Sequence, residues 1–128
     1  MESGLSQSAL VALKAGSVDV ALSKAKQLIL DDSSNVFALV LAADCFNQYG
    51  KEKEGLGLIQ AAVASSNQDP CFSLIQARQL LRLRQRDQSL ACVKSARQLH
   101  PHHAGLLLMQ FELLCLLRRY SEVRGIID

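Results

Sequence analysis

Apolar residues recur along this chain with the spacing of amphipathic helices. Leu39, Ala42, Ala43 and Phe46 follow the 0, 3, 4, 7 pattern that places side chains on one face of a helix. No stretch alternates apolar and polar residues in the manner of a half-buried strand. The pattern predicts an all-α chain, with helices near residues 4–15, 18–31, 36–49, 52–66, 71–84, 87–99, 104–118 and 120–128.

Turn-forming residues occupy the intervals between these helices. Gly16 and Gly50 can adopt the left-handed conformation that ends a helix. The polar segments 31–35 and 65–70 offer side chains that cap the next helix, and so does the segment 100–103 with its Pro and three His. These breaks divide the helices into antiparallel pairs.

The pairs repeat with a fixed period. Two columns of small residues recur every 34 residues: Ala9, Ala43 and Ala77 in one, and Ala21, Gly55 and Ser89 in the other. The period divides a single 128-residue domain into units 2–35, 36–69, 70–103 and a partial 104–128. Phe111 and Val123 occupy the small columns of the last unit, which we expect to be atypical or a capping repeat.

This period and these columns resemble the tetratricopeptide repeat family over essentially the whole chain. In that family a small residue of the first helix packs against a small residue of the second, which implies the pairs Ala9–Ala21, Ala43–Gly55 and Ala77–Ser89. The resemblance implies an α-solenoid of about three and a half repeats in a right-handed superhelix. The sequence stops within an apolar helical pattern, so we expect a fragment of a longer protein.

The resemblance also implies where a partner binds, because the first helix of each repeat lines a concave groove in that family. The implied groove residues are Phe37, Val40, Asp44, Asn47, Gln48, Leu74, Arg78, Leu81, Arg82, Leu108 and Glu112. Leu10, Asp44, Arg78 and Glu112 share one column. Either these charges pair with each other, or they form a polar groove with apolar pockets for a peptide.

Charge is unevenly distributed along the chain. Residues 1–69 contain five Lys and eight acids, and residues 70–128 contain eight Arg, one Lys and four acids. The second part therefore carries +5 (9 − 4), which suits an acidic partner or simply a solvated surface. Few aromatic residues are present for stacking on bases, so we favour a protein partner over RNA.

Catalytic chemistry lacks a motif in this sequence. Cys45, Cys71, Cys92 and Cys115 form no CxxC pair, which favours buried free thiols in a reducing compartment such as the cytoplasm. His100, His102 and His103 have no acid or Cys beside them in sequence, which favours an exposed turn over a metal site. We therefore expect no catalytic, cofactor-binding or metal-binding residues and a chain that is not an enzyme.

The sequence thus predicts a scaffold or adaptor module that binds a peptide or partner protein in its groove. Two alternatives remain: a substrate-recruiting accessory domain of a larger enzyme, and a small secretion-type chaperone. Some family members grip a C-terminal carboxylate with Lys, Asn and Arg, but the matching positions here hold Ser6, Leu10, Leu41, Cys71 and Ile75. We therefore expect no such clamp.

Two further expectations concern larger assemblies. A homodimer could form through an apolar face of the last repeat, made of Leu106, Leu107, Leu113, Leu116 and Leu117. No apolar run approaches the ~20 residues that span a bilayer, so we expect no membrane span.

Overall fold

The computed structural model describes the backbone of residues 2–66 and 69–127, and the side chains of residues 7–66, 69–119 and 121–124. Every regular element in these ranges is an α-helix: α1 (Glu2–Lys14), α2 (Val18–Asp31), α3 (Val36–Gln48), α4 (Glu52–Ser65), α5 (Pro70–Arg82), α6 (Arg86–Leu99), α7 (Ala104–Leu116) and α8 (Tyr120–Ile127). The predicted all-α architecture is confirmed, and the predicted helix ends agree to within two residues.

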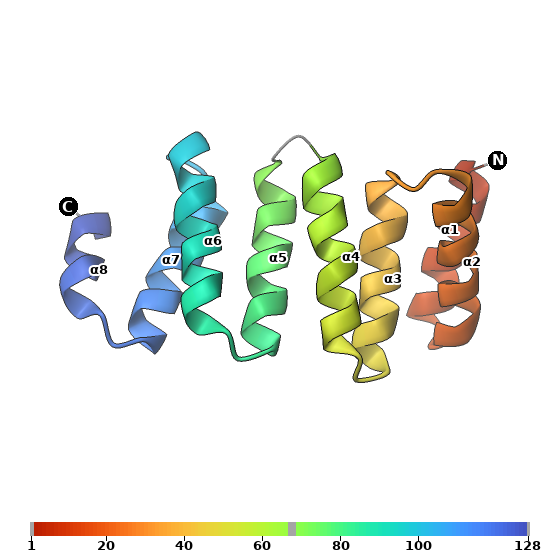
Figure 1. Cartoon of the computed structure of the whole chain (residues 1–128), viewed down its shortest axis with the longest axis horizontal. Coiled ribbons are helices and arrows are strands. Elements are labelled where there is room, and N and C mark those ends of the chain that lie inside the picture. The colour runs from red at the N-terminus through yellow and green to blue at the C-terminus, as the bar shows by residue number, and fades with distance from the viewer. Residues whose placement is uncertain (1, 67–68, 128) are drawn as a thin grey trace. The chain divides into compact units, whose positions relative to one another are not determined.

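The helices belong to two compact units, Met1–Asn67 with α1–α4 and Gln68–Asp128 with α5–α8. Within each unit, consecutive helices run antiparallel, as Figure 1 shows. Each unit is described by itself below. The first helix of each pair (α1, α3, α5 and α7) is called helix A, and the second helix B.

Every helix A ends in the same left-handed turn. The residues with positive φ are Gly16 (85°), Gly50 (77°), Arg84 (61°) and Arg118 (57°), which are spaced 34 residues apart. The residue after each donates its N–H to a carbonyl five residues back, as from Lys51 to Phe46 at 2.8 Å. This is the Schellman arrangement, which satisfies carbonyls that the helix end leaves free.

The beginnings of three A helices follow the same period. Asn35 Oδ1 accepts the N–H of Ala38 at 3.2 Å, and Asp69 Oδ1 accepts that of Cys71 at 2.9 Å. At the equivalent place, His103 Nδ1 accepts the N–H of Leu106 at 3.2 Å. The boundary segments therefore cap the following helices, and His103 has a structural role as an N-cap.

The small columns lie where helices A and B cross. Ala9, Ala43, Ala77, Ala21 and Ser89 are fully buried, and Gly55 is also buried. The Ser89 hydroxyl donates to the Ala77 carbonyl at 2.7 Å, so side chain and backbone meet directly at the crossing of α5 and α6. A large side chain has no room at so close a contact.

The fourth repeat departs from this pattern at Phe111. Its side chain is 38% exposed, whereas the alanines of the same column are 0% exposed. The last helix pair therefore does not enclose this position as completely as the other pairs enclose their alanines. The expectation of an atypical last unit agrees with this difference.

The residues predicted to form an exposed apolar face for a homodimer are partly wrong. Leu106 and Leu113 are fully buried, in one cluster with Leu90 and Val93 of α6. The sequence suggested an open face because the 34-residue period did not show that α6 already covers this side of α7. Of the five predicted leucines, Leu116 is the exposed one, at 48%.

Enlarging a residue of the small column tests the crossing. We expect Ala77→Leu to destabilise the chain by about 1–3 kcal/mol, because the extra atoms cannot fit between α5 and α6. The matched control is Ala91→Leu on α6, which places the same change at an exposed position. Urea unfolding followed by far-UV circular dichroism should separate the two variants, and equal midpoints would contradict the close crossing.

Exchanging the residues of the left-handed turns should move stability in opposite directions. Gly50→Arg should cost about 1–2 kcal/mol, the penalty of a left-handed residue with a Cβ. Arg84→Gly should gain up to about 1 kcal/mol for the same reason. Arg86→Gly, in the first turn of α6, is the control and should not stabilise, because glycine weakens a helix. Urea midpoints provide the measurement, and a stabilising Gly50→Arg would be the contrary result.

Candidate functional site

In the first unit, the predicted groove residues lie along one side of α3. Phe37 is 41% exposed, Asp44 and Gln48 are exposed, and Val40 and Asn47 are half-buried. The residues between them, such as Ala38 and Leu41, are buried. The helix A face of this unit therefore presents one aromatic ring, one carboxylate and two amides at the surface.

In the second unit, the predicted residues lie on α5 and α7. Arg78 and Arg82 are exposed one turn apart, beside the half-buried Leu74 and Leu81. Leu108, on α7, is 59% exposed, and Glu112 follows it one turn later. The face combines two guanidinium groups with apolar side chains, a mixture that suits a partner with both acidic and apolar groups.

The helices α5 and α7 approach closely at one end of this face. A Cβ added to Gly105 would lie 2.8 Å from Cδ1 of Leu74 and 3.0 Å from Cε1 of His103. The missing side chain of Gly105 therefore lets the beginning of α7 lie against Leu74. Leu74 and Leu108 thus belong to adjoining helices of one surface.

The alternative of charges that pair with each other is not supported within the second unit. Among its described residues, Arg78 and Glu112 form no ion pair with one another; the ion pairs there join Glu122 to Lys94 and Arg119. Asp44 belongs to the first unit, and its pairing with Arg78 stays a prediction. Arg78 and Glu112 are thus available to charged groups of a partner.

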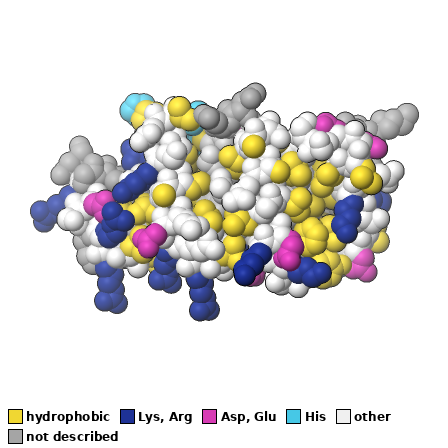
Figure 2. All heavy atoms as spheres, in the orientation of Figure 1, with side chains coloured by type: hydrophobic (Ala, Val, Ile, Leu, Met, Phe, Trp, Pro, Cys, Tyr) yellow, Lys and Arg dark blue, Asp and Glu magenta, His cyan; other side chains and the backbone are white. Residues whose placement is uncertain are grey.

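The sequence reading missed an apolar hollow on another side of the first unit. It has a volume of about 340 Å³ and is lined by Lys26, Ile29, Leu30, Ala42, Phe46 and Leu58, from α2, α3 and α4. Figure 2 shows hydrophobic side chains gathered over α3 between α2 and α4. Leu30 lines this hollow and is 87% exposed, so packing between helices does not explain an apolar residue at this position. Helical periodicity places Leu30 and Lys26 on one face of α2, but it does not show that α3 and α4 complete the hollow.

A second hollow adjoins the first at Lys26. Its volume is about 280 Å³, and its lining is more polar: Asp19, Leu22, Ser23, Lys26 and Tyr49. The Tyr49 hydroxyl donates to Asp19 Oδ1 at 2.6 Å. This hydrogen bond is the main cause that raises the pKa of Tyr49. Tyr49 therefore stays a neutral phenol and fixes the Asp19 carboxylate at the far end of the hollow.

The cysteines differ from the buried set that the sequence predicted. Cys45 is buried, but Cys71 is exposed and Cys92 and Cys115 are half-buried; all four are free thiols. Burial raises the pKa of both Cys45 and Cys92, which keeps these groups as thiols and lowers their reactivity. The prediction of four buried thiols is wrong because the repeat places Cys71 in the exposed first turn of α5.

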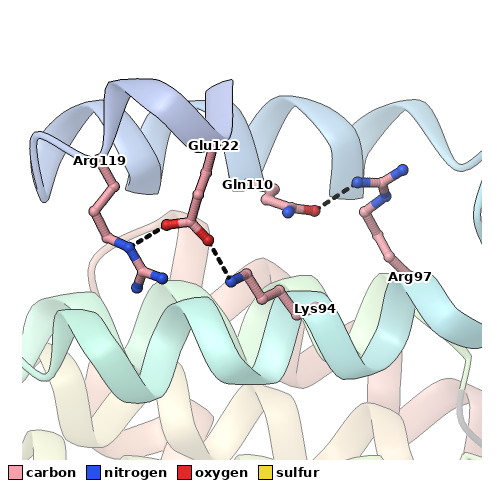
Figure 3. Close-up of polar contacts among 5 residues, drawn as sticks. All are labelled: Lys94, Arg97, Gln110, Arg119 and Glu122. Atoms are coloured by element: carbon pink, nitrogen blue, oxygen red, sulfur yellow. Dashed lines mark hydrogen bonds and ion pairs between the residues drawn. The ribbon is translucent and has the colours of Figure 1, made fainter. Parts of the chain in front are cut away.

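Polar contacts link the last helices of the second unit, as Figure 3 shows. Glu122, on α8, accepts a hydrogen bond from Lys94 of α6 at 3.1 Å and forms an ion pair with Arg119. Arg97 donates to Gln110 Oε1 at 2.7 Å and so joins α6 to α7. The hydrogen bond from Lys94, followed by that from Arg119, lowers the pKa of Glu122. Glu122 therefore helps to position α8 against α6.

Removing the charge of Glu122 should loosen α8. Its pKa is lowered in the folded chain, so its stabilising effect is present above the pKa of an unpaired Glu and is lost as the pH falls through the lowered value. Glu122→Gln should thus speed amide hydrogen exchange in α8 at neutral pH and make little difference in acid. Glu112→Gln, which removes an exposed carboxylate of α7, is the control. Equal exchange in both variants at neutral pH would contradict this role.

Groups of three or more His, Cys, Asp or Glu side chains that could hold a metal ion do not occur among the described residues. Within the same part of the chain, no helix is long and apolar enough to cross a membrane. The surfaces that remain as candidate sites are the helix A faces and the hollows of the first unit.

No family model matches the sequence, and no curated protein matches it. Solved structures do. A tetratricopeptide repeat protein from Parabacteroides merdae matches with a TM-score of 0.82 at 12% identity, over 98% of this chain and 49% of that one. The first such domain of Spaghetti (RPAP3), bound to the HSP90 peptide SRMEEVD, matches with a TM-score of 0.76 at 14% identity, over 91% and 93%.

A third match is the O-GlcNAc transferase of Thermobaculum terrenum, with a TM-score of 0.72 at 18% identity, over 88% of this chain and 22% of that one. These identities are low, so the likeness concerns the backbone. It agrees with the antiparallel helix pairs and with the columns of small residues spaced 34 apart. The chain therefore has the tetratricopeptide-repeat fold.

Proposed function

We propose that this chain is a protein-interaction module whose helix A faces bind a peptide or a partner protein. The observation that carries the proposal is the face of α5, where exposed Arg78 and Arg82 lie beside half-buried Leu74 and Leu81. Guanidinium groups beside apolar side chains are typical of binding surfaces, because Arg forms directed bonds to carboxylates while its stem packs on apolar groups. A protein of the same fold holds a peptide.

The charge of this surface favours an acidic partner. Arg78 and Arg82 have no recorded carboxylate partner within the described part of the second unit. Residues 70–128 carry +5, so the field of the whole region attracts negative charge. An acidic segment with one or two large apolar residues would use both components of the surface.

The HSP90 peptide of the similar structure contains acidic residues, but this chain is less suited to bind it than those residues alone suggest. The positions where a carboxylate clamp would place Lys, Asn and Arg hold other residues here, as described above. One of them, Leu41, is 4% exposed and belongs to the core of the first unit. We therefore propose an internal acidic segment of a partner in place of a C-terminal carboxylate.

A second candidate function is recruitment of substrate for a larger enzyme. The match to the O-GlcNAc transferase favours it, because there the same fold occupies a part of an enzyme chain. In that case the helix A faces would hold a protein substrate, and a region outside these residues would supply catalysis. Both candidate functions require Arg78 and Arg82 to bind the partner or the protein substrate.

Charge reversal on α5 tests the proposal. A displayed library of random peptides would be selected on the wild-type chain, and the enriched peptides measured by fluorescence polarisation. We expect enrichment of Asp and Glu beside large apolar residues. The double variant Arg78→Glu/Arg82→Glu should weaken binding by about tenfold or more, because attraction becomes repulsion at two positions.

The matched control is Arg84→Glu/Arg86→Glu, which changes the same net charge on exposed residues beyond the end of α5. It should keep most of the affinity. Circular dichroism would show that both variants are folded. If the two double variants lost affinity equally, binding would depend on net charge and not on the α5 face; if neither did, the proposed surface would be excluded.

A further inference from the structure

The apolar hollow of the first unit faces away from the helix A surface. Ala42 and Phe46, which line the hollow, lie two residues on either side of Asp44. Two residues correspond to roughly 200° of rotation about a helix, so the hollow and Asp44 occupy opposite sides of α3. A ligand in the hollow would therefore not compete with a peptide on the helix A face.

The apolar hollow is lined by one charged group, Lys26, and the acid of the adjoining hollow, Asp19, accepts the hydroxyl of Tyr49. Among the described residues, Lys26 forms no ion pair; its ammonium lies 6.0 Å from the centroid of the Phe46 ring. The other residues of the lining are apolar. A cation at the edge of an apolar hollow favours a ligand that combines a large apolar group with a negative charge.

The size and shape of the site favour a peptide. A volume of about 340 Å³ is at the lower end of the range of ligand sites, roughly 300–1,000 Å³. The adjoining polar hollow extends the surface along α2 from Leu30 to Asp19, a distance of about 16 Å at 1.5 Å per residue. About five residues of an extended chain cover that length.

We propose that the two adjoining hollows along α2 form a second peptide-binding site, which takes a segment with a large apolar residue followed by an acidic one. The apolar side chain enters the hollow against Phe46 and Leu30. The carboxylate binds the ammonium group of Lys26. The next residues lie over Ser23 and the Tyr49–Asp19 pair, where Asp19 accepts a further hydrogen bond from the peptide.

The exposure of Leu30 supports this assignment. It is 87% exposed and lines the apolar hollow, so a partner that covers it would bury a whole aliphatic side chain. Such burial stabilises a complex in proportion to the apolar area removed from water. Isolated exposed leucines are common, but this one adjoins Phe46, Ile29 and Leu58 at one hollow.

A charge-exchange experiment tests the site. The probes are two fluorescein-labelled peptides in a Gly-Ser frame, one with Leu-Phe followed by Asp-Ser and the other with Leu-Phe followed by Lys-Ser. The α5 face is proposed to take the same class of peptide, so binding is measured in the Arg78→Glu/Arg82→Glu background. In that background the chain should bind the acidic peptide about tenfold more tightly than the basic one. Lys26→Glu should reverse this preference, and Leu30→Ser should weaken the binding of the acidic peptide.

Matched controls use the same substitutions on exposed residues of α1: Lys14→Glu and Val11→Ser. Both should keep the preference for the acidic peptide. If the wild-type chain preferred the acidic peptide and the Arg78→Glu/Arg82→Glu background did not, the peptide would bind the α5 face alone and the second site would be excluded. Circular dichroism would confirm that each variant is folded.

Nuclear magnetic resonance locates the peptide independently. Addition of the acidic peptide should shift the signals of Ala42, Phe46 and Leu58. Shifts confined to Phe37 and Asp44, or an unchanged preference in Lys26→Glu, would overturn the proposal. Decanoate is the remaining probe: if it bound Lys26 and neither peptide did, the site would take a free carboxylic acid, and the assignment of a peptide would be wrong.

Discussion

The close crossing of helices A and B is the contact on which the rest of the fold depends. At its clearest point, the Ser89 hydroxyl meets the Ala77 carbonyl at 2.7 Å, and both residues are fully buried. Such a contact allows only a methyl group, a hydroxymethyl group or a hydrogen as side chain. Once the backbones approach this closely, the larger side chains of each helix must turn toward the neighbouring helices or toward solvent. The binding faces described above consist of the side chains that turn outward.

Much of the fold was predictable because the crossing leaves a periodic trace in the sequence. Ala9, Ala43 and Ala77 identify the crossings directly, and Gly16 and Gly50 identify two of the turns. Arg84 and Arg118 occupy the same turn, but nothing in a single arginine indicates a left-handed residue. The fold was predictable because the 34-residue period indicates these two turns from the glycines at the equivalent positions of the first two repeats.

The candidate sites were less predictable, for a physical reason. The helix A surface follows from the family resemblance and from the repeat position of each residue. The apolar hollow depends on how three helices leave a space between Lys26, Ala42 and Leu58, which are far apart in the sequence. Periodicity describes one helix at a time, so it cannot show a space that several helices enclose. The burial of Leu106 and Leu113 was missed for the same reason, since it depends on α6.

The left-handed arginines have a consequence for how the two units respond to salt. The C-terminal end of a helix carries a partial negative charge from its aligned peptide dipoles. Arg84 and Arg118 are positively charged residues just beyond the ends of α5 and α7, where the corresponding turns of α1 and α3 have Gly16 and Gly50. The attraction contributes roughly 0.3–1 kcal/mol and offsets part of the backbone penalty. Because ions screen this attraction, added salt should weaken the helix ends of the second unit more than the end of α3, which has a glycine turn and no basic residue in its last turn.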